Sequence, residues 1–398
     1  NVKNIKNIIL SAVLVLIIAQ SLNFVLGISS FENYFRNLLI AKYKVINKEM
    51  RRQIETGINF GKPLYKFSGM DQIFNKTKGN DKEIKKIFIT DVLGTILYSL
   101  DNSDAGKKNI FADNVKFSEK DLEASENVTS KGFVYTILPI FENEGAGKKW
   151  VGDAYLAFDE SVIKKEISKT FNENIVKFAI FLVVAIFVLI LLITVITFID
   201  EKKSGKKTIT LKNKQFLIIV LVLVSSQLIY SFSNHKYYEK AYLRTTDSNL
   251  KSFSAVLSKN IEFFTNLGLP IERLKKAEYL LADRLKDVSE CREINVTDKN
   301  GKVLYKVDET VKESILEENS TLRASPLSID LENTELKQIS EIKSQEKTFG
   351  YIALFINKKM IDSKLFELLM DALTVIAVSL IFSFELLVLF SFFVDRKK

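Results

Sequence analysis

Four long stretches of this chain are almost free of charged side chains, and they constrain the fold more than any other feature. Each contains 20 or more residues without Asp, Glu, Lys or Arg, except that the last one contains a single glutamate. A helix of about 20 apolar residues crosses a hydrocarbon core about 30 Å thick. The stretches therefore predict four membrane-spanning helices and exclude a soluble enzyme. Their charged borders are Lys6 and Glu32, Lys177 and Asp200, Lys214 and Lys236, and Asp371 and Asp395.

The net charge of +9 is concentrated beside the apolar stretches. The segment from Glu201 to Lys214 contains six lysines, and further basic residues lie near both ends of the sequence. Basic residues favour the cytoplasmic side of a membrane. The charge thus predicts topology in a cell (cytoplasmic or inner) membrane and gives no reason to expect a nucleic-acid partner: both termini and the lysine loop lie inside, and both large segments are extracytoplasmic.

These borders divide the chain into eight segments. A cleaved signal peptide is the alternative for the first one, but the stretch stays apolar through Leu26 and is longer than a typical signal peptide requires. We interpret it as a retained helix. The expected segments are transmembrane helices at 7–29, 175–199, 215–234 and 371–394, extracytoplasmic domains at 30–174 and 235–370, a cytoplasmic loop at 200–214 and a cytoplasmic end at 395–398.

The sequence matches itself at a nearly constant offset, which predicts an internal duplication. The offset is 207 residues in the first half of each unit and falls to 198 and then 195 further on, as expected if the second copy is shorter. The matching pairs include Gln20 with Gln227, Gly61 with Gly268, Thr90-Asp91 with Thr297-Asp298, Gly152 with Gly350, and Asp200 with Asp395.

Each copy combines helical and strand patterns, which predicts an α+β fold. A long helix over about 31–59 and 237–266 continues from the membrane as a stalk and ends before a Gly and Pro pair. Short helical pieces follow, and then apolar residues alternate with a period of two, which predicts antiparallel strands. The expected strands are 87–91, 96–99, 132–141 and 150–158 in the first copy and 294–297, 303–307, 335–342 and 349–356 in the second, each set followed by a helix returning to the membrane.

This arrangement resembles the Cache family of extracytoplasmic sensor domains. The resemblance rests on Gly61-Lys62-Pro63-Leu64 and Gly268-Leu269-Pro270-Ile271, on the hairpins at 88–98 and 294–305, and on late strands containing Gly152 and Gly350. It covers both extracytoplasmic domains, each similar to a single Cache unit. The resemblance implies a PAS-like pocket for a small ligand such as a carboxylate or an amino acid, whose occupancy is passed to the membrane helices.

Five polar or aromatic residues are candidates for contacting such a ligand. Tyr135 and Thr136 lie on a central strand, Trp150 begins the next strand, and Arg323 with Ser325 lies in a strand-like segment of the second copy. A guanidinium group can hold a carboxylate through two hydrogen bonds. Each residue also has an ordinary structural interpretation: Tyr135 and Trp150 as packing residues and Arg323 as a solvated charge.

Nothing in the sequence indicates catalysis, a cofactor or a metal. The chain has one histidine, His235, and one cysteine, Cys291, so a transition-metal site of the usual His and Cys kind has no ligand set. There is no phosphate-binding glycine loop and no nucleophile elbow. We therefore expect that the protein is not an enzyme.

Glu385 is the one acidic residue inside an apolar stretch. It lies ten positions before Asp395 and hence about 15 Å below the interface. Ionisable groups at this depth are costly and need a partner or a cavity. Gln20 and Gln227 in the first and third helices are the expected hydrogen-bond partners. The node that they form with Glu385 couples the two units, contacts a further membrane domain, or only holds the helices together.

The sequence thus predicts a multi-pass membrane sensor that binds a small molecule and signals to an output absent from these residues. That output is a partner or a further C-terminal domain, and a homodimer is a further expected association. Two alternatives stay open. One is the sensory or substrate-capture part of a transporter, and the other is a structural protein of the cell envelope without a ligand.

Overall fold

The computed structural model describes most of the chain and divides it into two compact units. One unit comprises 1–35, 163–242 and 363–398, and the other comprises 36–162 and 243–362. We call them the membrane unit and the sheet unit. The described residues are 2–79, 81–102, 104–111, 117–118, 124–144, 147–203, 209–266, 268–274, 277–308, 337–344 and 347–395.

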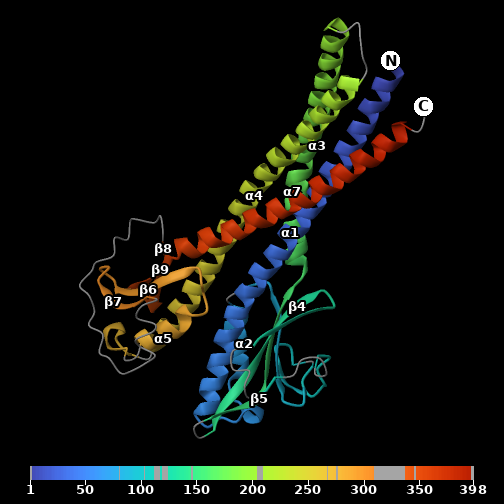
Figure 1. The fold of residues 1–398 in the computed structure, drawn as a ribbon. Coiled ribbons are helices and arrows are strands. Elements are labelled where there is room, and N and C mark those ends of the chain that lie inside the picture. Colours follow the sequence, from blue (N-terminus) through green and yellow to red (C-terminus); the bar gives the residue numbers. More distant parts are fainter. Residues whose placement is uncertain are drawn as a thin grey trace. The chain divides into compact units, whose positions relative to one another are not determined.

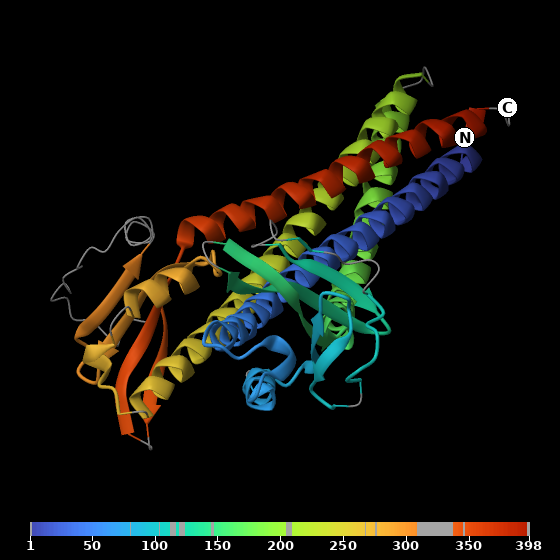
Figure 2. The same cartoon turned by 90° about the horizontal axis from the view of Figure 1, so that it is seen from below.

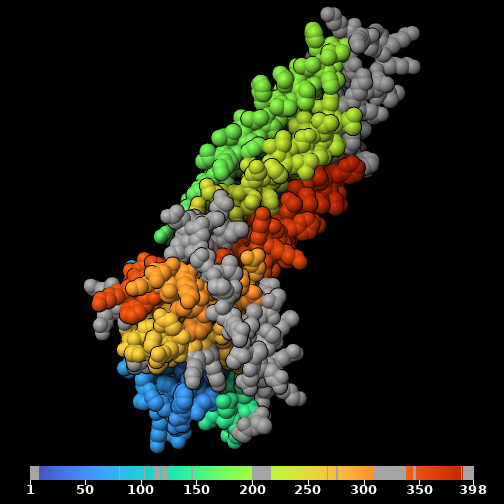
Figure 3. Space-filling model, turned by 90° about the vertical axis from the view of Figure 1, so that its left-hand side faces the viewer, coloured from blue at the N-terminus to red at the C-terminus, as the bar shows by residue number. Residues whose placement is uncertain are grey.

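Four helices of the structure are long and apolar enough to cross a membrane. In the membrane unit they pack through small and branched apolar side chains, among them Ala12, Val15, Leu189 and Leu223. Figure 3 shows α3 in green and α4 in yellow-green as adjoining ridges. The four helices are α1 (Val2–Asn59), α3 (Ser161–Lys203), α4 (Ile209–Asn266) and α7 (Lys358–Asp395).

The first sheet has five antiparallel strands in the order β2-β1-β5-β4-β3. Figure 1 labels two of them, β4 and β5. Two short helices precede it, η1 (Leu64–Lys66) and α2 (Met70–Lys78). Its longest strands, β4 and β5, are the central pair, and β5 leads directly into α3. The strands are β1 (Ile84–Asp91), β2 (Ile96–Ser99), β3 (Glu126–Ser130), β4 (Phe133–Glu144) and β5 (Gly147–Asp159).

The four described strands of the second sheet are antiparallel and have the order β7-β6-β9-β8, which repeats the order β2-β1-β5-β4 of the first sheet. The helices η2 (Ile271–Arg273) and α5 (Ala277–Leu285) precede it. Apolar side chains of α4, α5 and the strands form one core, including Phe253, Leu281, Ile294 and Leu354. The strands are β6 (Cys291–Asp298), β7 (Val303–Asp308), β8 (Lys337–Ser344) and β9 (Lys347–Ile356).

The first hairpin of each sheet turns in the same way. The carboxylate of Asp91 accepts hydrogen bonds from the backbone N–H groups of Leu93 and Thr95, at 2.9 and 2.8 Å. Asp298 accepts from Asn300 and Lys302 at 2.8 and 2.9 Å. Short acidic side chains cap turns in this way. Asp91 and Asp298 therefore cap equivalent hairpin turns.

Each sheet contains a glycine at a place where the backbones of two neighbouring strands approach each other very closely. A Cβ atom at Gly152 would collide with the carbonyl oxygen of Thr90, and one at Gly350 would collide with that of Thr297. In each case the glycine pairs with the aspartate of the hairpin, Asp91 or Asp298. Only glycine lets the two backbones approach this closely.

The part of α1 after the membrane unit packs along one face of the first sheet (Figures 1 and 2). The ring of Tyr43 stacks on Phe158 with centroids 4.1 Å apart. Such a pair stabilises by about 0.5–1.5 kcal/mol beyond the burial of its surface. Asn47, fully buried, donates to the carbonyl oxygens of Thr136 and Ala154 at 2.8 and 3.1 Å. The helix is thus joined to both central strands by packing and by hydrogen bonds.

Most predicted elements lie where the sequence placed them, within a few residues at their ends. The long stalk helices end at Asn59 and Asn266, and each of the eight expected strands is found among the nine strands of the described residues. Strand β3 was not expected. Its sequence, Glu126–Ser130, is polar, and its burial alternates only weakly because it lies at the sheet edge.

Candidate functional site

Two of the predicted ligand residues, Tyr135 and Thr136, point to opposite faces of the first sheet. Successive side chains alternate between the faces of a strand. Thr136 faces α1, where its hydroxyl accepts a hydrogen bond from Asn47 at 3.2 Å. Tyr135 faces the other side, where its ring contacts Phe111 edge-on at 4.8 Å. A ligand on one face can touch only one of the two side chains.

The face that carries Tyr135 is lined by aromatic rings, and we call it the aromatic face. Phe88 stacks on Tyr155 at 4.5 Å, and Trp150 packs against the same cluster. Phe111 and Phe117 come from the segment between β2 and β3 and cover part of this face. Trp150 and Tyr135 therefore belong to the same aromatic cluster. The buried members are Phe88, Ile96, Phe111, Phe117, Tyr135, Ile137, Tyr155 and Ala157.

Asp153 lies among these rings and is only 4% exposed. The indole Nε1 of Trp150 donates a hydrogen bond to its Oδ1 at 2.9 Å. Burial raises the pKa of Asp153 to about 7, against the opposing effect of this hydrogen bond. Within the described residues no lysine or arginine forms an ion pair with Asp153. The aromatic face therefore contains a buried carboxyl group that forms no ion pair with any described lysine or arginine.

Further polar groups surround this carboxyl group. Thr90 pairs with Asp153 across β1 and β5, and its fully buried hydroxyl has no well-formed hydrogen bond with any described residue. The same is true of the amide nitrogen of Asn109. Both side chains lie beside the hydroxyl of Tyr155, whose pKa is raised by burial and by the neighbouring Asp153. Hydrogen bonding from Thr90 and Asn109 lowers the pKa of the Tyr155 hydroxyl, so these two buried side chains are imperfectly bonded and not without partners.

The chemistry of this arrangement favours a positively charged group. Aromatic faces attract cations through their quadrupole, most strongly for tryptophan. A carboxylate in a low-dielectric site pairs strongly with an ammonium group. A ligand that carried only a carboxylate would meet the charge of Asp153 with the same sign.

The sequence did not identify Asp153, Thr90, Asn109 or Tyr155 as site residues. The signal for Asp153 was present, because it is the only charged residue in the apolar strand segment 150–158. An acidic side chain at an inward position of a strand needs a partner or a function. The other two candidates, Arg323 and Ser325, lie outside the described residues, as does the strand-like segment expected around them.

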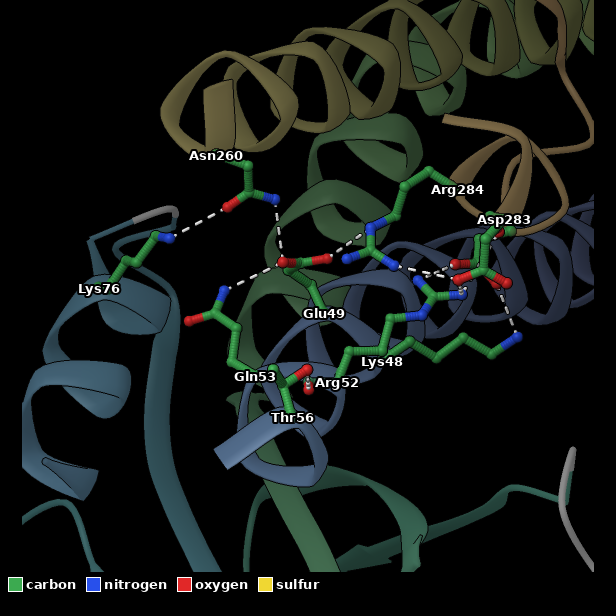
Figure 4. Close-up of polar contacts among 10 residues, drawn as sticks. Lys48, Glu49, Arg52, Gln53, Thr56, Lys76, Asn260, Asp283 and Arg284 are labelled. Carbon is green, nitrogen blue, oxygen red and sulfur yellow. Dashed lines mark hydrogen bonds and ion pairs between the residues drawn. The ribbon is translucent and has the colours of Figure 1, made fainter. Parts of the chain in front are cut away.

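A second polar cluster joins α1 to the second domain within the sheet unit, and we call it the ionic cluster (Figure 4). Asp287, whose side chain is 3% exposed, bonds to Lys48 at 2.8 Å and to Arg52 at 2.6 Å. Arg52 also pairs with Asp283 at 3.0 Å. The pKa of Arg52 is raised, because both aspartates favour its charged form more than burial opposes it.

Glu49 forms the other half of the ionic cluster. Its carboxylate pairs with Nε of Arg284 at 2.8 Å and accepts from the amides of Asn260 and Gln53 at 2.9 and 3.0 Å (Figure 4). Asn260 in turn accepts a hydrogen bond from Lys76 of α2 at 3.0 Å. The short helix of each domain thus contacts the stalk helix of the other: α5 contacts α1, and α2 contacts α4.

A cavity of about 110 Å³ lies beside the ionic cluster, between α1, α4 and the segment that joins α5 to β6. Its walls include Val45, Phe253 and the ion-paired side chains of Glu49, Arg284 and Asp287. This volume holds several water molecules. The charged groups that line the cavity already form ion pairs across the two domains. We therefore assign a structural role to this region, which is to hold the two domains together.

The polar residues predicted inside the membrane bond to serines. Gln20 donates to Ser226 at 2.7 Å, and Gln227 donates to Ser379 at 2.9 Å. Ser379 then donates to the backbone oxygen of Ala19 at 3.1 Å. Glu385 is exposed on α7, and the structure shows no hydrogen bond from either glutamine to it. The expected association of Glu385 with the two glutamines is not formed in this arrangement.

No group of three or more His, Cys, Asp or Glu side chains able to hold a metal ion is found among the residues described. The comparisons with known proteins add no further assignment: no protein family model matches the chain, and no curated protein matches it either.

Proposed function

We propose that this protein is a multi-pass membrane sensor whose first extracytoplasmic domain binds a small ligand carrying a positively charged amine. The proposal rests mainly on one observation: Asp153, buried among aromatic rings without a bonded cation. Amino acids and simple amines fit this chemistry better than plain carboxylates. The resemblance to Cache sensors is consistent with such a ligand.

The second domain lacks this chemistry at the corresponding position. Thr90 pairs with Asp153 in the first sheet, whereas Thr297 pairs with Tyr351 in the second. The place of Tyr155 is taken by Ala353, two residues further along β9. We therefore assign ligand binding to the first domain and a supporting role to the second.

The opposite face of the first sheet provides a route for the signal. Strands β4 and β5 carry Tyr135 and Asp153 on the aromatic face and hold α1 on the other face through Asn47. The backbone N–H of Phe141 also bonds to Glu55 of α1 at 3.0 Å. Because β5 ends at Asp159 and α3 begins at Ser161, a shift of β5 on binding acts on two membrane helices at once.

We further propose that the two domains arose by duplication and lie outside the cytoplasmic membrane. Beyond the equal strand order, the contacts between α1 and α4 support the duplication. They join residues 206, 208 and 211 positions apart, close to the sequence offset. Two copies of one helix packed side by side in parallel and in register give this pattern, as in a symmetric dimer.

The test is a thermal unfolding screen of the full chain in detergent, followed by the emission of Trp150, the one tryptophan of the sequence. The compounds are free amino acids, primary and quaternary alkylamines, and dicarboxylates without an amine. We expect amine-bearing compounds to raise the unfolding temperature at pH 8, where the carboxyl of Asp153 is mostly ionised. A ligand at 100 times its Kd adds about 2.7 kcal/mol.

Two variants make this test specific. Asp153→Asn should abolish the shift, whereas Asp247→Asn should leave it intact, since Asp247 pairs with Lys251 on the exposed face of α4. The proposal is wrong if no compound shifts the midpoint, or if dicarboxylates shift it equally in the wild type and in Asp153→Asn.

A further inference from the structure

The ionic cluster contains two helix contacts that occupy corresponding positions in the two copies. Helix α1 contacts the segment of α5 in the second copy, and α4 contacts α2 in the first copy. The offset of 207 residues superimposes α2 (Met70–Lys78) on α5 (Ala277–Leu285) from end to end. In a symmetric pair, a contact between residues i and j is repeated as a contact between j and i. The two contacts can therefore be compared position by position.

The contact between α1 and the α5 segment is made by ion pairs. Asp287 bonds to Lys48 and Arg52 at 2.8 and 2.6 Å. Glu49 pairs with Arg284 at 2.8 Å. The side chains of Asp287 and Glu49 are only 3% and 8% exposed. Removing one partner of a buried ion pair is strongly destabilising, because the other charge stays buried without compensation.

The corresponding contact between α4 and α2 has a different charge pattern. Lys76 of α2 donates a hydrogen bond to Asn260 of α4 at 3.0 Å. Burial lowers the pKa of Lys76, and the nearby charge of Glu49 opposes this shift. The positive charges of Lys259 and Arg284 lower it further. In place of Lys48, Glu49 and Arg52 this contact has Ala255, Val256 and Lys259, and in place of Asp283, Arg284 and Asp287 it has Lys76, Thr77 and Asn80.

We propose that the ionic cluster selects the second domain as the partner of the first and rejects a pair of two first domains or two second domains. In a pair of first domains, Lys48 and Arg52 would meet no acidic residue at the positions of the two aspartates. In a pair of second domains, Arg284 would meet Val256 in place of Glu49. Either pair leaves charges without partners at a buried contact, whereas the pair of unlike domains satisfies them.

This selection determines which domains share a pair of stalk helices. Each pair then contains one domain with the proposed amine site and one domain without it. The homodimer expected from the sequence must use a surface other than the ionic cluster. The inference rests on the proposed duplication, which supplies the correspondence of positions, and it does not depend on the proposed ligand.

The test is disulfide formation in the full chain in detergent, in a Cys291→Ser background. Gln53 and Asn260 are 207 positions apart, and both side chains bond to Glu49. Gln53→Cys with Asn260→Cys should form a disulfide within one chain, which measures pairing of unlike domains. Gln53→Cys alone forms a disulfide only between two chains, which measures pairing of two first domains. With the natural charges we expect little of this second product.

Moving the acidic residues from the second copy to the first tests the role of charge. The exchanged chain should give at least ten times more disulfide between chains at Gln53→Cys, and less disulfide within the chain. An exchange of the same kind on exposed surfaces, Lys149→Asp with Asp247→Lys, is the control and should change neither yield. The exchange of acidic residues consists of Lys76→Asp, Asn80→Asp, Asp283→Lys and Asp287→Asn.

The emission of Trp150, which lies on the aromatic face and outside the ionic cluster, shows whether each variant folds. If the full exchange does not fold, Lys76→Asp with Asp287→Asn is measured in its place and should shift both yields in the same directions. The proposal is overturned if the natural charges give as much disulfide between chains as the exchanged charges, or if a folded exchanged chain keeps the original yields. Amine binding at Asp153 is measured separately, so the failure of one proposal is distinguishable from the failure of the other.

Discussion

Replacing Asp153 by asparagine should make the first domain more stable at neutral and alkaline pH. Asparagine has the same shape and keeps an oxygen that accepts the hydrogen bond from Trp150. It removes the ionisable group, whose pKa rises from 3.8 to about 7 on burial. A shift of about 3 units corresponds to roughly 4 kcal/mol between the two protonation states.

The direction of the pH dependence of stability follows from which state, folded or unfolded, binds the proton of Asp153 more tightly. The folded domain holds the proton of Asp153 more strongly than the unfolded chain, so this group contributes stability below about pH 4. That contribution decreases as the pH rises and is fully lost above pH 7. The advantage of Asp153→Asn over the wild type should therefore grow by about 3 kcal/mol between pH 5 and pH 8.

Trp150 provides the assay, because it is the only tryptophan and its indole bonds to Asp153. Urea unfolding of the full chain in detergent, followed by Trp150 emission, gives the free energy of unfolding at each pH. In the native wild type the emission itself should titrate near pH 7, and this titration should be absent in Asp153→Asn. Equal pH dependence of stability in both proteins would refute the reasoning.

Three further predictions concern other parts of the sheet unit. Arg52→Glu should destabilise the contact between α1 and α5 by about 3–5 kcal/mol, and adding Asp287→Arg should restore part of it, as measured by a double-mutant cycle. Gly152→Ala should lower the unfolding temperature more than Gly147→Ala, where the nearest atom to the new methyl lies 3.7 Å away. Cys291, whose pKa burial raises to about 12, should react with a maleimide at pH 8 only after unfolding, and fast labelling of the native chain would contradict its burial.

The sequence was sufficient to predict most helices and strands, because local patterns of apolar and polar residues determine them. Hydropathy located the four long helices, and period-two alternation located the central strands. The paired matches at a constant offset also placed equivalent turns at Asp91 and Asp298, which the structure confirms. Strand β3 was missed because an edge strand with polar residues has no such pattern.

The candidate site was predicted only in part, for a geometric reason. Alternation along β4 already implied that Tyr135 and Thr136 face opposite sides, but both were proposed for one ligand. The same alternation along β5 places Asp153 on the face of Tyr155 and opposite to that of Ala154. Helical spacing on α7 likewise separates Glu385 from Ser379 and Ser383, so its outward direction was contained in the sequence.

The ionic cluster could not have been predicted in this way. Lys48 and Asp287 are 239 positions apart, and no local pattern relates them. Their pairing depends on how two domains pack, which is set by the whole sheet unit. From the sequence alone, charged residues on a stalk helix predict a face exposed to solvent, because the surface that packs against them is not known.

Helix α1 is the element on which both domains of the sheet unit converge. Tyr43, Asn47 and Glu55 recur at multiples of four residues and hold the first sheet. Lys48 and Arg52, also four residues apart, hold α5 of the second domain. Side chains four apart share a helix face, so α1 presents one stripe to each domain. A ligand that shifts β5 must move the first stripe, and because a helix is stiff, the second stripe and the ionic cluster move with it. We therefore expect the ligand binding proposed for the first domain to reach the second domain through α1, without a ligand bound to the second domain itself.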